Sequence, residues 1–432
     1  MFRKLVYKLG TKYRNPSMSA CFNELRSTQF ASSEELRKLQ DEKLSELAAF
    51  CYLNSPFYQE HFKAIGINPC NEPFLRKHLV KLPILKKDSL IKFNNDIHTV
   101  NTFTFDKLFL AETSGSTGQA LTFYKDERWD SYNRSSINRG LAWFNVAPWE
   151  KNGYFWGFNF NFLRKLKTIF LDLLMNRFRL FSYSQIELNT FLNKCKRAKY
   201  LEGYSSMIYE TAKLANELGV KLDNISVIKG TSEKIYPHYH TETLKAFGCK
   251  MISEYGSAES GIIAFECPNG KMHINEETCI IEEVGGKAIV TNLVARSFPT
   301  IRYDLGDYIK LSDKKCSCGR SHQVLEEVTG RVGKNIIGED GQKYPSLTLY
   351  YVFKNIAVVH GLELTYRCEQ SSVGLLDVYI EVVIDKKLEE ILNREFSKYF
   401  KSNVICNYMY VKSVRVKGKK LKDFESKLFN DQ

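Results

Sequence analysis

The chain has 432 residues, which is more than one hydrophobic core usually serves, so we expect two or more domains. Hydrophobic residues make up 44% of the chain and charged residues 26%, which excludes a disordered protein and is ordinary for a globular one. The net charge of +13 suits a polyanion or an anionic membrane surface. The basic residues are spread along the chain without a nucleic-acid-binding motif, so no nucleic acid partner is expected.

Residues 2–14, FRKLVYKLGTKYR, place Phe2, Leu5, Val6 and Leu9 at helical spacing among basic residues. This pattern is typical of a basic amphipathic helix, either a solvated terminal helix, which we favour, or a peripheral membrane contact. We find no signal peptide, and no run approaches the roughly 20 apolar residues that cross a bilayer. The 11 cysteines without an export signal favour reduced thiols, so a cytoplasmic location is expected.

Further along the chain, the elements follow an α/β pattern. Residues 32–53 predict a helix with a serine cap, and the runs LFLA and LTFY (108–111 and 121–124) predict strands. Helices ending at Gly219 and Gly248 each precede a strand, and His238 and His240 are expected at the exposed start of the second helix. After Cys279 the chain is rich in strands, and its last hundred residues mix strands with helices.

The segment between the first two strands, TSGSTG (113–118), is rich in glycine and hydroxyl groups. No Gly-Lys-Ser/Thr follows, which excludes a Walker-type loop, and the Rossmann fingerprint is excluded because a strand comes next. Gly115 and Gly118 permit a bent backbone with exposed N–H groups, and the hydroxyl groups add donors suited to phosphate oxygens. A linker or a plain turn is the alternative.

Five motifs follow one another in a set order: ETSGSTG (112–118), YGSAE (255–259), IRYDLGD (301–307), GR (330–331) and GKK (418–420). Together they resemble the signature of the adenylate-forming superfamily, the acyl- and aryl-CoA synthetases. The closest resemblance is to the phenylacetate–CoA ligase-like branch, especially its capsular-polysaccharide-biosynthesis members. It covers about residues 35–428. The fold that it implies is a large adenylate-forming domain of α/β subdomains, residues 1–330, and a small mobile α+β domain, residues 331–432.

The resemblance implies an ATP- and Mg²⁺-dependent ligase that activates a carboxylic acid as an acyl-adenylate. Glu259 would bind Mg²⁺, which prefers carboxylate oxygen. Tyr255 would lie against the adenine and Asp307 would bind the ribose. Lys420 would balance the charge that develops as pyrophosphate leaves. The residues assigned to the nucleotide by resemblance are Thr113, Ser114, Gly115, Ser116, Thr117, Gly118, Tyr255, Gly256, Ser257, Asp307 and Arg331.

Each of these residues taken singly also has a structural explanation. Glu259 would then be a solvated surface acid, Asp307 a turn residue and Arg331 a surface arginine. The ordered set favours function.

Two departures from the family pattern support an alternative. The loop usually continues with Lys-Pro, whereas here Gln119 and Ala120 follow, and either Lys419 or Lys420 could be the catalytic lysine. The alternative is a degenerate non-catalytic or acyltransferase-type homologue that binds nucleotide weakly.

The sequence does not determine the acceptor of the acyl group. The candidates are a thiol, of coenzyme A or a carrier protein, or an amine, of an amino sugar or amino acid. The branch suggests the decoration of a surface glycan.

A second cluster of side chains is predicted from CPNGKMH (267–273) and CSCGRSH (316–322). Cys267, His273, Cys316 and Cys318 form a Cys₃His set suited to structural Zn²⁺, with His322 as another candidate for the fourth ligand. The alternative is a set of buried or turn residues without a metal.

Overall fold

The structure, a computed structural model, describes residues 2–113, 121–155, 162–180, 185–331, 335–415 and 423–428. Within these ranges, the side chains left undescribed are those of Phe162, Arg164, Gln185, Arg331, Pro345, Leu347, Lys354 and Val358. The chain divides into two compact units. The first comprises Met1–Asn152, Ile169–Arg177 and Ile252–Val328, and the second comprises Gly153–Thr168, Phe178–Met251 and Thr329–Gln432.

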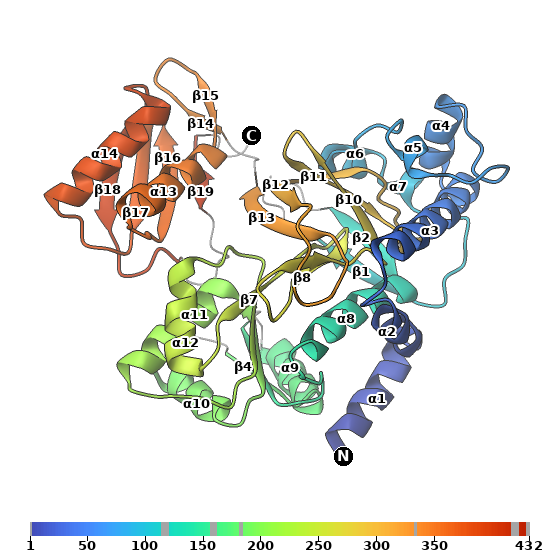
Figure 1. Ribbon diagram of the computed structural model, residues 1–432, viewed down its shortest axis with the longest axis horizontal. Helices are drawn as coiled ribbons and strands as arrows, with labels where there is room; N and C mark the ends of the chain where they lie inside the picture. The colour runs from blue at the N-terminus through green and yellow to red at the C-terminus, as the bar shows by residue number, and fades with distance from the viewer. Residues whose placement is uncertain are drawn as a thin grey trace. The chain divides into compact units, whose positions relative to one another are not determined.

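The first unit begins with helices (Figure 1). Their bounds are α1 Phe2–Arg14, α2 Met18–Ser27, α3 Ser33–Asn54, α4 Pro56–Ala64, α5 Arg76–Leu79, α6 Lys87–Lys92, α7 Asn94–Ile97 and α8 Glu127–Ala142. The predicted helix over residues 32–53 is confirmed as α3. Ser32 caps it by accepting a hydrogen bond from the Glu35 N–H, and the Glu35 carboxylate accepts one from the Ser32 N–H. Leu36, Leu44 and Leu47 recur on its buried side, which fixes α3 to the core.

The strands of the first unit form a hairpin and a larger sheet. The hairpin joins β1 (Leu108–Glu112) and β2 (Thr122–Asp126), as the sequence predicts. The sheet places its strands in the order β10, β11, β12, β13, β9, β8, β7. Their bounds are β7 Met251–Ser257, β8 Gly261–Glu266, β9 Met272–Ile274, β10 Cys279–Val284, β11 Lys287–Asn292, β12 Tyr303–Ser312 and β13 Val324–Arg331.

A buried ion pair links these strands to α8. Arg139 Nη1 lies 2.5 Å from Glu277 Oε1, and both side chains are almost fully buried. Burial alone would raise the pKa of Glu277, but the charges of Arg139 and His322 hold that pKa well below its usual range. The pair therefore stabilises the packing of α8 only while both charges are present.

The second unit contains the strands β6, β5, β3 and β4, in that order, and the helices that pack beside them. The bounds are β3 Asn152–Phe155, β4 Arg177–Arg179, α10 Gln185–Cys195, β5 Tyr200–Tyr204, α11 Ser205–Glu217, β6 Val227–Thr231 and α12 Pro237–Phe247. Helix α9 (Phe162–Leu174) begins in the second unit and ends in the first. Gly248 adopts a left-handed conformation and ends α12, as predicted.

A smaller, separate sheet lies near the C-terminus, with strand order β18, β17, β16, β19. The bounds in this part are β14 Asn335–Ile337, β15 Lys343–Pro345, α13 Leu347–His360, β16 Tyr366–Ser372, β17 Leu375–Ile380, α14 Lys386–Phe400, β18 Ile405–Tyr410 and β19 Phe424–Ser426. The predicted α/β class with a small α+β part near the C-terminus is confirmed. The predicted boundary between a domain of residues 1–330 and one of residues 331–432 stays a prediction.

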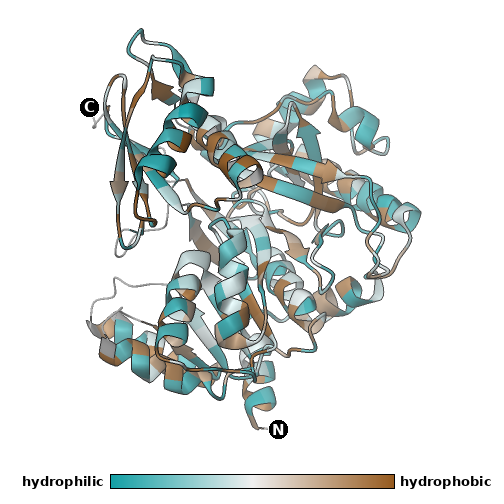
Figure 2. Cartoon of the chain, turned by 60° about the vertical axis from the view of Figure 1, so that its left-hand side comes forward, coloured by the Kyte–Doolittle hydropathy of each residue, from teal (hydrophilic) through white to brown (hydrophobic). Residues whose placement is uncertain are grey.

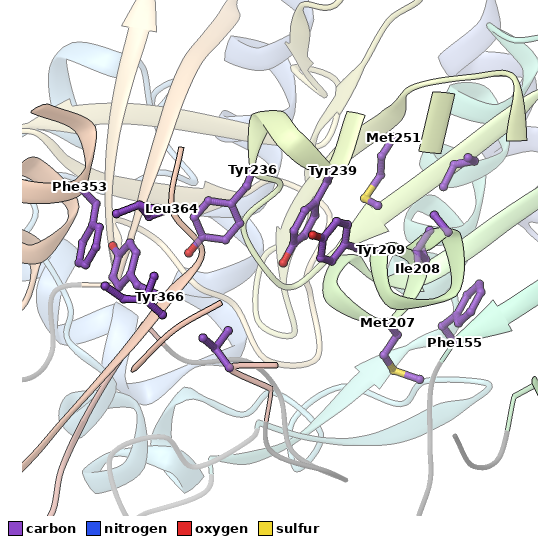
Figure 3. Close-up of a cluster of buried hydrophobic side chains, with 14 of the residues drawn as sticks. Phe155, Met207, Ile208, Tyr209, Tyr236, Tyr239, Met251, Phe353, Leu364 and Tyr366 are labelled. Atoms are coloured by element: carbon purple, nitrogen blue, oxygen red, sulfur yellow. The ribbon is translucent and has the colours of Figure 1, made fainter. Parts of the chain in front are cut away.

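The core of the second unit is rich in aromatic rings (Figure 3). Tyr366 stacks on Phe353 at 3.6 Å between ring centroids, and the Tyr236 hydroxyl donates to Asp423 Oδ1 at 3.2 Å. Tyr209 stacks on Tyr239 at 4.1 Å. Helices α11 and α12 therefore share one core with the C-terminal sheet.

The prediction that His238 and His240 are exposed is wrong. Both lie at the start of α12, as expected, but they are half-buried. His238 Nε2 is hydrogen-bonded to Thr365 Oγ1 at 2.6 Å, and burial lowers the pKa of His238 to about 4. The sequence around α12 does not reveal the segment that covers it.

In the described part of the chain, no helix combines the length and apolar composition needed to cross a membrane.

We expect Arg139→Met to destabilise the first unit by about 3–5 kcal/mol, because it leaves the Glu277 carboxylate buried without its partner. Urea unfolding followed by tryptophan fluorescence would measure this, since Trp129, Trp143 and Trp149 all lie in the first unit. Lys310→Met is the matched control, because it removes an exposed pair with Glu326, and it should cost less than about 1 kcal/mol. Equal losses in the two variants would contradict the role given to the buried pair.

Candidate functional site

The glycine-rich segment connects strands β1 and β2 in the chain. Residues 114–120, which include Ser114 to Gly118, are outside the described residues, but both ends of the segment are described. The Thr113 N–H donates to the Leu121 carbonyl at 2.9 Å, and Thr113 Oγ1 accepts from the Leu121 N–H at 3.0 Å. The two predicted strands are therefore paired up to both ends of the glycine-rich segment.

Asp126 fixes the far end of the hairpin. Its Oδ1 accepts the Trp129 N–H and caps α8. Its Oδ2 accepts from the backbone N–H groups of Arg296 and Ser297. The end of the hairpin opposite the glycine-rich segment is thus anchored to the body of the first unit.

The YGSAE motif forms the end of β7 and its tight turn into β8. Ser257 pairs with Gly261, and the Ser257 hydroxyl accepts the Ser260 N–H at 2.9 Å. A Cβ on Gly256 would lie 2.3 Å from the Gly261 carbonyl oxygen, so only glycine fits at this position. The turn places Glu259 two residues beyond the end of the strand.

Glu259 is buried and held from two sides. Its Oε1 accepts a hydrogen bond from the Tyr303 hydroxyl at 3.2 Å, and its backbone carbonyl accepts one from Asn292 Nδ2 at 3.1 Å. It is only 5% exposed, so it is not the solvated surface acid of the alternative interpretation. Tyr303 begins β12 within the IRYDLGD motif, and its contact joins two of the predicted motifs.

A second contact joins the same two motifs. The Tyr255 hydroxyl donates to Asp307 Oδ2 at 3.0 Å, although the two residues are 52 positions apart in the chain. Asp307 lies in a bulge of β12, because Lys287 pairs with Tyr308 while Ile289 pairs with Asp304. Gly306, with φ of 75°, supplies the left-handed conformation in this bulge. The bulge directs Asp307 toward Tyr255.

Lys125 is a cation that sequence reasoning missed. Burial lowers its pKa, and the carboxylates of Asp130 and Glu259 act in the opposite direction. Its ammonium group lies 5.2 Å from the Trp129 ring centroid. A single lysine in a short strand carries no pattern that would have indicated its relation to Glu259.

The other predicted nucleotide contacts lie in the C-terminal part of the chain. Arg331 is the last residue of β13, and its side chain is outside the described residues. Lys419 and Lys420 also fall outside them. Their assignment to the site stays a prediction.

The four predicted metal ligands lie together in the first unit. One ligand atom from each of Cys267, His273, Cys316 and Cys318 lies within 4.8 Å of the others. The Cys267 and Cys316 sulfurs are 3.7 Å apart, and the Cys318 sulfur is 3.2 Å from His273 Nε2. Around a tetrahedral Zn²⁺ with Zn–S bonds of about 2.3 Å, two sulfurs lie about 3.8 Å apart. The donor set and its spacing therefore fit such an ion.

His322, the other candidate for the fourth ligand, has a different place. Its Nε2 lies 2.9 Å from Glu277 Oε1, and its backbone carbonyl accepts from His273 Nδ1 at 3.3 Å. The second contact leaves His273 Nε2 directed to the Cys318 sulfur, because the carbonyl holds the other ring nitrogen, as is common for zinc-binding histidines. Burial lowers the pKa of His273 to about 4, which keeps its ring neutral at neutral pH.

Comparison with known proteins was made by sequence and by structure. No family model matches the chain. Protein CapK of Staphylococcus aureus is 24% identical over 307 residues, which span 65% of this chain and 64% of CapK. Phenylacetate-coenzyme A ligase of Thermus thermophilus is 24% identical over 342 residues, which span 72% of this chain and 74% of the ligase. The predicted resemblance to the phenylacetate–CoA ligase-like branch is confirmed.

The solved structures show the same fold. 2-Hydroxyisobutyryl-CoA ligase in the postadenylation state, in complex with R3-HIB-AMP, matches with a TM-score of 0.67 at 15% identity. The match covers 94% of this chain and 91% of the ligase. An open conformation of the same ligase, with 2-HIB-AMP and CoA, matches with a TM-score of 0.60 at 14% identity over 91% of this chain and 92% of the ligase. The predicted adenylate-forming fold is therefore confirmed.

Proposed function

We propose that the protein is an ATP-dependent, AMP-forming ligase that activates a carboxylic acid and passes the acyl group to a thiol or an amine. The observation that carries this proposal is the meeting of two family motifs through the Tyr255–Asp307 and Glu259–Tyr303 contacts. These contacts bring together four side chains from two motifs that are far apart in the sequence, which supports a shared nucleotide site. The confirmed resemblance to the family supports the same assignment.

In the proposed first step, a carboxylate oxygen of the acid attacks the α-phosphorus of ATP and forms the acyl–phosphate bond. The bond to the β-phosphate breaks, and its electron pair leaves with pyrophosphate. Because both reactants are anions, the site must supply positive charge and hydrogen-bond donors. Glu259 would hold Mg²⁺, residues 113–118 would bind the β- and γ-phosphates, and Lys420 would stabilise the leaving pyrophosphate.

The Tyr255–Asp307 pair would position the nucleoside. The Tyr255 hydroxyl orients the Asp307 carboxylate, which would accept hydrogen bonds from the ribose hydroxyls, while the Tyr255 ring would pack against the adenine. Gly256 and Ser257 would lie beside the nucleotide, and Arg331 would reach the ribose or a phosphate.

In the second step, the acceptor attacks the acyl carbon and AMP leaves with the electron pair of the broken bond. Coenzyme A is the acceptor that we favour, because the relatives and neighbours include a phenylacetate-coenzyme A ligase and a CoA ligase with bound CoA. The alternative acceptor is an amine in surface-polysaccharide assembly. It is supported by the resemblance to the capsular members of the branch.

A degenerate homologue with weak nucleotide binding is the second candidate, and Gln119 in place of the usual loop lysine favours it. ATP–pyrophosphate exchange across a panel of aromatic, aliphatic and hydroxy acids separates the two candidates. Exchange with any acid supports the ligase. No exchange, together with no ATP binding, supports the degenerate homologue.

Lys420→Ala should lower ATP–pyrophosphate exchange by about 100-fold or more, because the charge of departing pyrophosphate loses its partner. ATP binding, measured by calorimetry, should be retained. Lys419→Ala is the matched control and should change exchange by less than about tenfold. The reverse ranking would move the role to Lys419, and full exchange in both variants would refute a catalytic lysine at either position.

Glu259→Gln should raise the Mg²⁺ concentration needed for exchange and lower the maximal rate by about 100-fold, since one negative ligand is lost. Tyr303→Phe keeps the carboxylate and removes one hydrogen bond, so it should cost only up to about tenfold. The exposed Glu283→Gln controls for the loss of charge. A Mg²⁺ titration curve of Glu259→Gln that overlays the wild type would rule out metal binding by this residue.

We also propose that Cys267, His273, Cys316 and Cys318 hold a structural Zn²⁺. When bound, such an ion ties together the loops that carry its ligands, and four protein ligands leave no open position for catalysis. Protein purified without chelators should contain one zinc per chain by elemental analysis. Cys316→Ser/Cys318→Ser should remove the zinc and lower the thermal midpoint, whereas Cys70→Ser, at an exposed free cysteine, should change neither. A full zinc content in the double variant would refute this ligand set.

A further inference from the structure

Helix α9 exposes large apolar side chains to water and buries its one acidic residue. Asp172 is buried, at 5% exposure, whereas Phe170 and Leu173 are 60% and 58% exposed. The other exposed apolar residues of this helix are Leu163, Leu166, Ile169, Leu171 and Leu174. An apolar face of this extent on one helix is uncommon in a monomeric protein and indicates a binding surface.

Helix α1 carries a narrower exposed stripe. Phe2, Leu5, Leu9 and Tyr13 recur at spacings of three and four residues, and each is more than half exposed. Its basic residues are Arg3, Lys4, Lys8, Lys12 and Arg14, and the helix has no acidic residue. Lys4, Lys8 and Lys12 recur every four residues and line one side of the apolar stripe. In Figure 2, teal and brown segments lie side by side on this helix at the end marked N.

The opposite side of α1 attaches it to the first unit. The Tyr7 hydroxyl accepts a hydrogen bond from Asn138 Nδ2 at 3.0 Å, and the Tyr7 ring packs on Trp149. Arg3 Nη1 donates to the Leu173 carbonyl at 2.8 Å, near the C-terminal end of α9. This bond brings the N-terminal turn of α1 next to the C-terminal end of α9, within the unit that holds residues 169–174.

We propose that α1 and the exposed apolar side chains of residues 169–174 in α9 form a surface that binds an anionic lipid bilayer peripherally. Apolar side chains would enter the boundary between headgroups and acyl chains, while Lys4, Lys8 and Lys12 would contact lipid phosphates. A second copy of the chain would bring the same basic side chains against this surface, and they would repel. A nucleic acid would use the lysines and leave the apolar stripe in water.

Vesicle co-sedimentation tests this proposal without reference to ligase activity. The full chain should sediment with vesicles of phosphatidylcholine containing phosphatidylglycerol, bind vesicles of phosphatidylcholine alone only weakly, and dissociate at high salt. Leu5→Glu/Leu9→Glu and Phe170→Glu/Leu173→Glu should each lower the partition coefficient at least about tenfold. Lys8→Gln/Lys12→Gln should weaken binding to the anionic vesicles and leave the weak binding to phosphatidylcholine vesicles unchanged.

Leu53→Glu/Val80→Glu is the matched control, since it makes the same change at two exposed apolar positions of the first unit. It should bind like the wild type, and unchanged thermal midpoints would show that all variants are folded. Failure of the wild type to bind anionic vesicles would overturn the proposal, as would equal binding by wild type and variants. A dimer in lipid-free sedimentation velocity that Leu5→Glu/Leu9→Glu dissociates would assign the surface to self-association and also overturn it.

Discussion

The first unit depends on one buried carboxylate, that of Glu277. It lies between β9 and β10 and has no exposed surface, so its charge must be balanced within the protein. Arg139 of α8 supplies that balance, and Thr28, which follows α2, donates a further hydrogen bond at 2.7 Å. Because a buried charge is stable only beside particular partners, few arrangements of the surrounding helices are possible. The ion pair thereby fixes helices and strands that are far apart in the sequence.

The same carboxylate also reaches the cysteine–histidine cluster. His322 is held by Glu277 through Nε2, and its carbonyl in turn holds the ring of His273. The orientation of one metal-ligand candidate is therefore set by a contact that starts at the ion pair. This order of dependence explains why His322, the histidine of the CSCGRSH segment, supports the cluster without joining it. Spacing in the sequence left both histidines as candidates, because it cannot distinguish a ligand from a residue that orients one.

Local features of the fold could be predicted from the sequence because their causes are local. The serine cap and leucine spacing of α3, and the alternation in β2, are read from neighbouring residues. The contacts that build the site are of another kind. Nothing in the sequence around Tyr303 or Asn292 shows that these residues hold Glu259. Resemblance to a family assigned Tyr255 and Asp307 to one nucleotide, but it did not predict the hydrogen bond between them. The bulge that directs Asp307 is likewise visible only once β11 and β12 are paired.

The exposed face of α9 is another feature that could not be predicted from the sequence alone. The sequence showed an apolar run interrupted by Asp172, and in isolation this helix would be expected to bury its leucines and expose its acid. Tertiary structure reverses that choice, since Asp172 is buried and the leucines are not. Exposing several large apolar side chains to water raises the free energy of the protein. Burying this face in an apolar environment would therefore be favourable. Beside the lysines of α1, that environment is better matched by an anionic lipid surface than by another equally basic protein.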